Sequence, residues 1–124
     1  MSDQAYILYI EDERPTLNLV CQMLKLGGYE AAGTTSGQEG LVMMRQRPPD
    51  LVLLDLMMPR PTGYDIYRDM KEEEMLANIP VIVISARVPE TGRVIVENLP
   101  PVQDYITKPF DMERLNRAIK RVIG

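Results

Sequence analysis

The sequence PDLVLLDLMMP, residues Pro49–Pro59, joins a short apolar run to a single aspartate, Asp55. The run Leu51–Leu54 is apolar throughout, which is typical of a strand buried on both faces of a parallel sheet. Burying a carboxylate alone is costly, so an aspartate at the end of such a strand needs a partner or a chemical role. Asp55 can therefore cap the loop that follows, or it can act as a nucleophile that forms an acyl phosphate.

Segments on both sides of this run predict four more strands. Ala5–Ile10 and Val81–Ile84 are almost continuously apolar, as Leu51–Leu54 is. Tyr29–Thr34 and Asp104–Thr107 are weaker strand candidates. Strands that alternate with helical segments are typical of an α/β protein with a parallel sheet.

The segments between the strands carry apolar residues three or four positions apart, which is the period of a helix packed on one face. The predicted helices are Leu17–Leu24, Leu41–Arg47, Tyr64–Leu76, Thr91–Leu99 and the residues after Asp111. Ser36 with Glu39 predicts a capping box before the second helix, and Asp111 predicts a cap on the last. Thr91–Leu99 contains a β-branched run, but its position requires a helix because consecutive parallel strands need a crossover. The predicted fold is therefore α/β, a (βα)5 doubly wound sheet of five parallel strands.

The composition indicates one domain and excludes several kinds of site. The 124 residues, 45% hydrophobic and 26% charged, predict a single globular domain over residues 1–124. A net charge of −4 argues against binding of nucleic acid or of an anionic membrane. One cysteine, Cys21, and no histidine exclude a disulfide framework, a histidine metal site and a Ser-His-Asp triad. This sequence carries no targeting pattern or membrane-spanning apolar stretch, so we expect a cytoplasmic protein.

Polar residues follow four of the predicted strands at one edge of the sheet, the edge where open α/β sheets bind ligands. They are Glu11, Asp12 and Glu13 after the first strand, Asp55 after the third, Ser85 after the fourth and Lys108 after the fifth. Carboxylates this close repel one another unless a proton or a cation joins them, and Mg²⁺ takes one or two carboxylates in proteins. A phosphoryl group in transfer needs its oxygens neutralised by metal and lysine, with a hydroxyl donor to orient it.

Each of these residues alone also has a structural explanation. Asp12 can cap the helix near Pro15, Ser85 can bind backbone, and Lys108 can lie in solvent. Taken together, they match a phosphoryl-transfer site in which Asp12 and Asp55 hold Mg²⁺ and Glu11 acts directly or through water.

Four motifs resemble those of response-regulator receiver domains of two-component signalling. ILYIEDE resembles the opening strand with its acidic pair, and PDLVLLDLMMP resembles the strand that is phosphorylated. IPVIVISA resembles the strand that ends in a phosphate-binding hydroxyl, and DYITKPF resembles the strand with a switch aromatic and a lysine. The resemblance covers essentially the whole chain, from Ile7 to Ile123, and implies the flavodoxin-like strand order 2-1-3-4-5.

The resemblance implies a role for each residue of these motifs. It implies Mg²⁺ as the cofactor, held by Glu11, Asp12, Asp55 and the backbone carbonyl of Met57. It implies Asp55 as the phosphoacceptor, Ser85 as the hydroxyl and Lys108 as the cation that bind the phosphoryl group, and Tyr105 as the aromatic that turns inward. It also implies a cis peptide bond at Lys108–Pro109, which points the lysine toward the acids.

The resemblance further implies how such a domain signals. A histidine kinase or a histidine phosphotransfer protein donates the phosphoryl group from its phosphohistidine to Asp55. The surface formed by Thr91–Leu99, Asp104–Thr107 and the last helix then changes, and a homodimer or an output partner can form there. Such a chain is a signalling domain rather than an enzyme, although it contributes to its own phosphotransfer and dephosphorylation.

Three other functions compete with this interpretation. A receiver-like docking module that works without phosphorylation would be favoured by loss of an acid or of the lysine, and this sequence has lost none. A dinucleotide- or flavin-binding domain needs a glycine-rich turn after the first strand, where this chain has acidic residues. A dehalogenase-type phosphatase carries a second aspartate two residues after the nucleophile, where this chain has Met57.

Overall fold

The computed structural model describes residues 4–86 and 102–124. In chain order its elements are β1 (Tyr6–Ile10), α1 (Arg14–Leu26), β2 (Glu30–Thr34), α2 (Gly37–Gln46), β3 (Leu51–Asp55), α3 (Gly63–Glu72), β4 (Val81–Ser85), β5 (Asp104–Thr107) and α4 (Met112–Ile123). The five strands form one parallel sheet in the order β2-β1-β3-β4-β5, which confirms the predicted topology. The helix predicted over Thr91–Leu99 lies outside the described residues.

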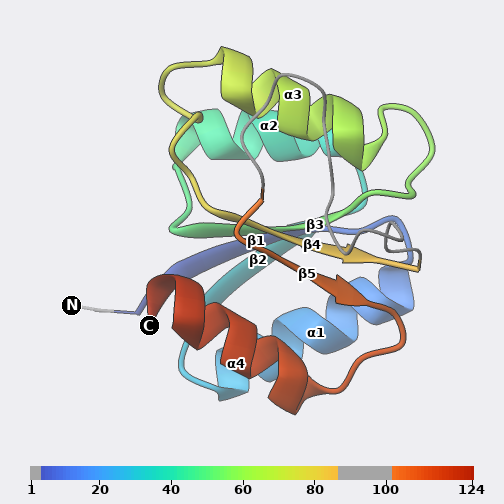
Figure 1. The fold of residues 1–124 in the computed structure, drawn as a ribbon, viewed down its shortest axis with the longest axis vertical. Helices are drawn as coiled ribbons and strands as arrows, with labels where there is room; N and C mark the ends of the chain where they lie inside the picture. Colours follow the sequence, from blue (N-terminus) through green and yellow to red (C-terminus); the bar gives the residue numbers. More distant parts are fainter. Residues whose placement is uncertain (1–3, 87–101) are drawn as a thin grey trace.

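The sheet is the middle layer of three, with α2 and α3 on one face and α1 and α4 on the other (Figure 1). The strand residues alternate between two hydrophobic clusters: Leu8 and Ile10 belong to the cluster under α2 and α3, whereas Ile7 and Tyr9 belong to the cluster under α1 and α4. Both faces of β1, β3 and β4 are buried along their whole length. This double burial explains why these strands have nearly continuous apolar sequences.

The strand register brings the predicted site residues to one edge of the sheet. Ile10 pairs with Leu54, so the residues that follow them, Glu11 and Asp55, lie next to each other. Ser85 pairs with Thr107 at the end of the next two strands, and Lys108 follows directly. Because all five strands run parallel, these residues meet at the carboxyl ends of the strands.

The helix ends match the sequence predictions at α1 and α4. Asp111 accepts a hydrogen bond from the Arg114 amide and begins α4, as predicted. Pro15 stands in the first turn of α1, where a missing amide hydrogen costs nothing, and Gly27 follows its last residue. Glu13 precedes α1 as its cap residue, so Asp12 does not cap this helix.

Two predictions for α2 and α3 were wrong in detail. Ser36 caps α2, but the Glu39 carboxylate accepts a hydrogen bond from the Thr34 hydroxyl instead of completing a capping box. The α3 helix ends at Glu72 rather than Leu76, because Glu73 leaves the helical conformation and pairs with Arg45 of α2. None of the helices in residues 4–86 and 102–124 is both long and apolar enough to cross a membrane.

Candidate functional site

Three carboxylates meet at the carboxyl ends of β1 and β3. Glu11 and Asp12 follow β1, Asp55 ends β3, and each of them offers an oxygen within 4.8 Å of the others. Glu11 is fully buried and Asp55 is 3% exposed, whereas Asp12 faces solvent. The structure therefore brings together the three acids that the sequence analysis selected, with one of them open to an incoming ligand.

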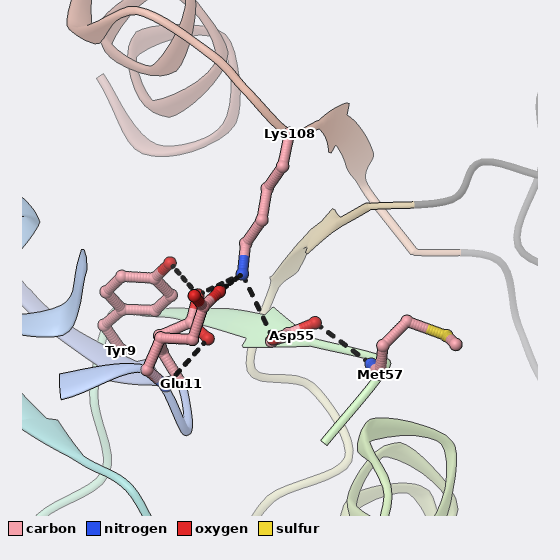
Figure 2. A network of polar contacts seen from close by, with 6 residues as sticks. Tyr9, Glu11, Asp55, Met57 and Lys108 are labelled. Atoms are coloured by element: carbon pink, nitrogen blue, oxygen red, sulfur yellow. Dashed lines mark hydrogen bonds and ion pairs between the residues drawn. The ribbon is translucent and has the colours of Figure 1, made fainter. Parts of the chain in front are cut away.

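Lys108 reaches into this acidic cluster from the loop after β5 (Figure 2). Its Nζ atom lies 2.5 Å from Glu11 Oε1, 3.2 Å from Asp55 Oδ2 and 3.3 Å from Glu13 Oε1. Its backbone amide donates to the Ser85 carbonyl at 2.8 Å, and the Lys108–Pro109 peptide bond is cis, as expected. One ammonium group thus contacts carboxylates that come from two different strands.

Tyr9 contacts the cluster too, and the sequence analysis missed it. Its hydroxyl donates to Glu11 Oε1 at 2.8 Å, and its side chain is fully buried (Figure 2). The signal that reveals it is the strand period, because residues two apart in a strand point to the same face. Tyr9 was interpreted only as part of an apolar strand, although its phenol can reach the acid two residues further on. Glu13, for which the sequence analysis predicted no separate role, also contacts Lys108.

The pKa values of the acids are shifted in different directions. Burial, together with the neighbouring Glu11, raises the pKa of Asp55 to about 6, although the Met57 amide opposes this by donating to Asp55 Oδ1 at 3.0 Å. Burial also raises the pKa of Glu11, but hydrogen bonds from Asp55, Lys108 and Tyr9 outweigh it, so the net shift is downward. Excess negative charge is therefore concentrated around Asp55.

The negative charge of the cluster also shifts the pKa values of Asp12 and Lys108. Partial burial and the Glu11 carboxylate raise the pKa of Asp12. Burial lowers the pKa of Lys108, but its ion pairs with Glu11 and Asp55 outweigh burial and raise it overall. Lys108 therefore stays charged at neutral pH.

The donor set of the cluster fits a hard divalent cation. Oxygen ligands from one or two carboxylates are what Mg²⁺ takes in proteins, and a second positive charge would relieve the repulsion that raises the pKa of Asp55. Met57 lies two residues after Asp55, and its amide donates to the Asp55 carboxylate. The part played by its carbonyl stays a prediction.

Ser85 lies at the same sheet edge as the acidic cluster, but Tyr105 does not. Ser85 ends β4, is buried, and accepts the Lys108 amide on its carbonyl, which places it at the same edge of the sheet. Tyr105 lies further back on β5, paired with Val83, and its side chain packs against the hydrophobic cluster under α2 and α3. The acids, Lys108 and Ser85 thus lie together at the carboxyl edge of the sheet, whereas Tyr105 lies on β5 outside this cluster.

An open groove of about 570 Å³ runs from the cluster along α1. It shares Glu13 and Lys108 with the site, and its walls are otherwise mostly apolar side chains of α1 and of the loop before α4. Leu19 is 60% exposed and Met23 38% exposed on the α1 side. Exposed apolar side chains therefore lie directly beside the charged site.

Comparison with known proteins places this arrangement in one family. The family model of the response regulator receiver domain matches residues 7–120. The chain is 31% identical to Protein PilH of Pseudomonas aeruginosa over 120 residues, which cover 97% of this chain and 98% of PilH. It is 36% identical to the phosphate regulon transcriptional regulatory protein PhoB of Escherichia coli over 118 residues, which cover 94% of this chain and 51% of PhoB. The chain therefore spans about half the length of the PhoB relatives.

A solved structure with the same fold carries a metal ion. The receiver domain of the sensor histidine kinase PA1611 from Pseudomonas aeruginosa is 26% identical and has a TM-score of 0.86, with 98% of both chains covered. That structure has a magnesium ion coordinated in its active-site cleft.

Proposed function

This chain belongs to the response regulator receiver domain family, and we propose that it accepts a phosphoryl group on Asp55 from the phosphohistidine of a histidine kinase or a histidine phosphotransfer protein. The observation that carries the proposal is the position of the Asp55 carboxylate. It is 3% exposed, lies 3.2 Å from the Lys108 ammonium, and shares its site with two more acids. A buried carboxylate with a cation beside it is poised as a nucleophile rather than as a loop cap.

The proposed step is an in-line displacement at phosphorus. A carboxylate oxygen of Asp55 attacks, a P–O bond forms, and the P–N bond to the donor imidazole breaks. The imidazole nitrogen leaves with the electron pair and is protonated. Lys108 neutralises charge on the phosphoryl oxygens, and the Ser85 hydroxyl donates a hydrogen bond to one of them.

Mg²⁺ is the proposed cofactor. Asp12, Asp55 and the backbone carbonyl of Met57 would hold it, with Glu11 bound directly or through water. When bound, the ion neutralises the phosphoryl oxygens and the acids around them. The proposal is supported by the donor set and by the magnesium ion in the related PA1611 receiver domain.

The groove along α1 is the proposed docking surface of the phosphodonor protein. It begins at Glu13 and Lys108, so a partner seated in it lies next to Asp55. The exposed side chains of Leu19 and Met23 offer apolar contacts to a partner helix. Phosphorylation would then be signalled through Ser85 and Tyr105 to a surface that includes β5 and α4, where an output partner or a second copy can bind.

A phosphoryl-labelling experiment tests this function. Incubation with phosphoramidate or acetyl phosphate and Mg²⁺ should add one phosphoryl group, which intact-mass spectrometry detects. Asp55→Asn should abolish the label, and Asp12→Ala should remove most of it together with its Mg²⁺ dependence. Asp50→Asn, a matched change at the other end of β3, should label as the parent does. Equal labelling of Asp55→Asn and the parent would exclude Asp55 as the acceptor, whereas a parent that takes up no label would leave a docking module as the better interpretation.

A further inference from the structure

One oxygen of the buried Glu11 carboxylate has two donors that come from different parts of the fold. Tyr9, on β1, donates its hydroxyl to Glu11 Oε1 at 2.8 Å, and the Lys108 ammonium lies 2.5 Å from the same atom (Figure 2). The other oxygen, Oε2, accepts the Glu13 amide at a longer 3.3 Å. Oε1 is therefore the atom that the Tyr9 hydroxyl and the Lys108 ammonium share.

The two donors, Tyr9 and Lys108, differ in how freely they can move away from Glu11 Oε1. The Tyr9 ring is fully buried in the hydrophobic cluster under α1 and α4, so its hydroxyl is fixed by packing. Lys108 has a long side chain with many rotatable bonds that stays partly open to solvent, and it divides its contacts among Glu11, Glu13 and Asp55. In the proposed function this ammonium has to turn toward a phosphoryl group on Asp55. Oε1 of the fully buried Glu11 would then lose its ammonium donor and keep only the Tyr9 hydroxyl as a side-chain donor, whether or not the carboxylate also helps to hold Mg²⁺.

We infer that Tyr9 is a positioning residue that keeps Glu11 Oε1 hydrogen-bonded when Lys108 turns from Glu11 to the phosphoryl group. This inference rests on the proposed function. A buried carboxylate that loses its last side-chain donor pays a large desolvation cost, so without the phenol the phosphorylated state would be disfavoured. The hydroxyl does not touch the reacting atoms, and its effect passes through Glu11.

The inference predicts different effects on the binding of two ligands of this site, Mg²⁺ and beryllofluoride. Mg²⁺ alone brings no anion that would draw Lys108 away from Glu11. Beryllofluoride, a tetrahedral anionic mimic of a phosphoryl group, occupies the position on Asp55 and attracts the lysine. Loss of the Tyr9 hydroxyl should therefore weaken the second ligand much more than the first.

The experiment compares Tyr9→Phe with the parent in the full chain, by titration calorimetry with Mg²⁺ and then with beryllofluoride at saturating Mg²⁺. For Tyr9→Phe we expect the Kd for Mg²⁺ to change by less than about threefold and the Kd for beryllofluoride to rise about tenfold, the order of one hydrogen bond to a charged group. Tyr67→Phe is the matched control, because Tyr67 is equally buried but lies in α3 under Lys71, on the other face of the sheet. It should bind both ligands as the parent does.

A second measurement serves if Tyr9→Phe is too unstable for calorimetry. In urea unfolding, Mg²⁺ should stabilise Tyr9→Phe as much as it stabilises the parent, and the further stabilisation by beryllofluoride should be smaller. Equal beryllofluoride binding in the two proteins would overturn the role of Tyr9, and so would an equal loss of both ligands. If the parent binds Mg²⁺ but not beryllofluoride, the proposed function itself fails and the inference with it.

Discussion

Two polar clusters lie at opposite ends of the same strands, and they balance their charges differently. At the amino end, Asp50 Oδ2 accepts the Tyr6 amide at 2.7 Å, while Arg47 pairs with Glu30 and lies 4.2 Å above the Tyr6 ring. Each carboxylate there has a donor of its own. At the carboxyl end, the carboxylates of Glu11, Glu13 and Asp55 share the single ammonium of Lys108.

The pKa shifts follow this difference. A hydrogen bond from Arg47 lowers the pKa of Glu30, because the pair is satisfied within the fold. Burial and Glu11 instead raise the pKa of Asp55 to about 6, because negative charge there exceeds positive charge. The amino-end cluster is complete by itself, whereas the carboxyl-end cluster gains stability from a cation. We therefore expect Mg²⁺ to alter the effect of a substitution on the free energy of unfolding only when the substitution lies in the carboxyl-end cluster.

The largest effect on stability is expected for Lys108→Met. The substitution leaves Glu11, which is fully buried, and Asp55 without their cation, and breaking a buried ion pair from one side costs on the order of 3 kcal/mol. We expect the free energy of unfolding to fall by about this amount without metal and to recover in saturating Mg²⁺. Urea unfolding with and without Mg²⁺ measures both. A loss that Mg²⁺ does not reduce would mean that Lys108 and the metal do not serve the same charges.

An opposite and smaller change is expected for Asp55→Asn. The amide keeps an acceptor for the Met57 N–H but removes one of the repelling charges, so without metal the variant should be more stable by about 1–2 kcal/mol at pH 7. A carboxyl whose pKa is higher in the folded than in the unfolded protein binds more protons when folded. The parent should therefore lose stability as pH rises from about 4 to about 6, and the variant should lack this loss.

Unfolding measured across this pH range checks the prediction. The advantage of Asp55→Asn should be small near pH 4 and should grow until about pH 6. Saturating Mg²⁺ should reduce the difference, because the ion supplies the missing positive charge to the parent. An advantage that is constant across the pH range would show that charge repulsion at Asp55 is not its cause.

The same comparison explains how much could be predicted from the sequence. The buried strands could be predicted, because burial on both faces leaves a continuous apolar run that needs no knowledge of the partners. Asp55, Ser85 and Lys108 could be selected, because parallel strands bring their carboxyl ends to one edge. These inferences depend on local patterns and on one rule of topology.

Contacts between distant side chains could not be predicted in the same way. The Glu39 carboxylate accepts from the Thr34 hydroxyl rather than from the Ser36 amide, and the Glu73 carboxylate pairs with Arg45. Both partners belong to other elements, β2 and α2. Tyr9 was the exception, because the strand period places its side chain on the same face as Glu11. The contact was missed because Tyr9 was counted only as an apolar strand residue, although its phenol hydroxyl can also donate a hydrogen bond.

The smallest effect is expected at the amino end, for Asp50→Ala. This change removes the acceptor of the Tyr6 amide at the start of β1, a single hydrogen bond near solvent. The loss should be about 1 kcal/mol or less, since water can replace the carboxylate in part. It should be the same with and without Mg²⁺, because every charge at this end already has its own partner. Arg47→Met, which breaks only an exposed pair, is the control and should be equally insensitive to the metal. If Mg²⁺ restored the stability of Asp50→Ala as it does that of Lys108→Met, the two clusters would not be independent, and the contrast between the ends of the sheet would be wrong.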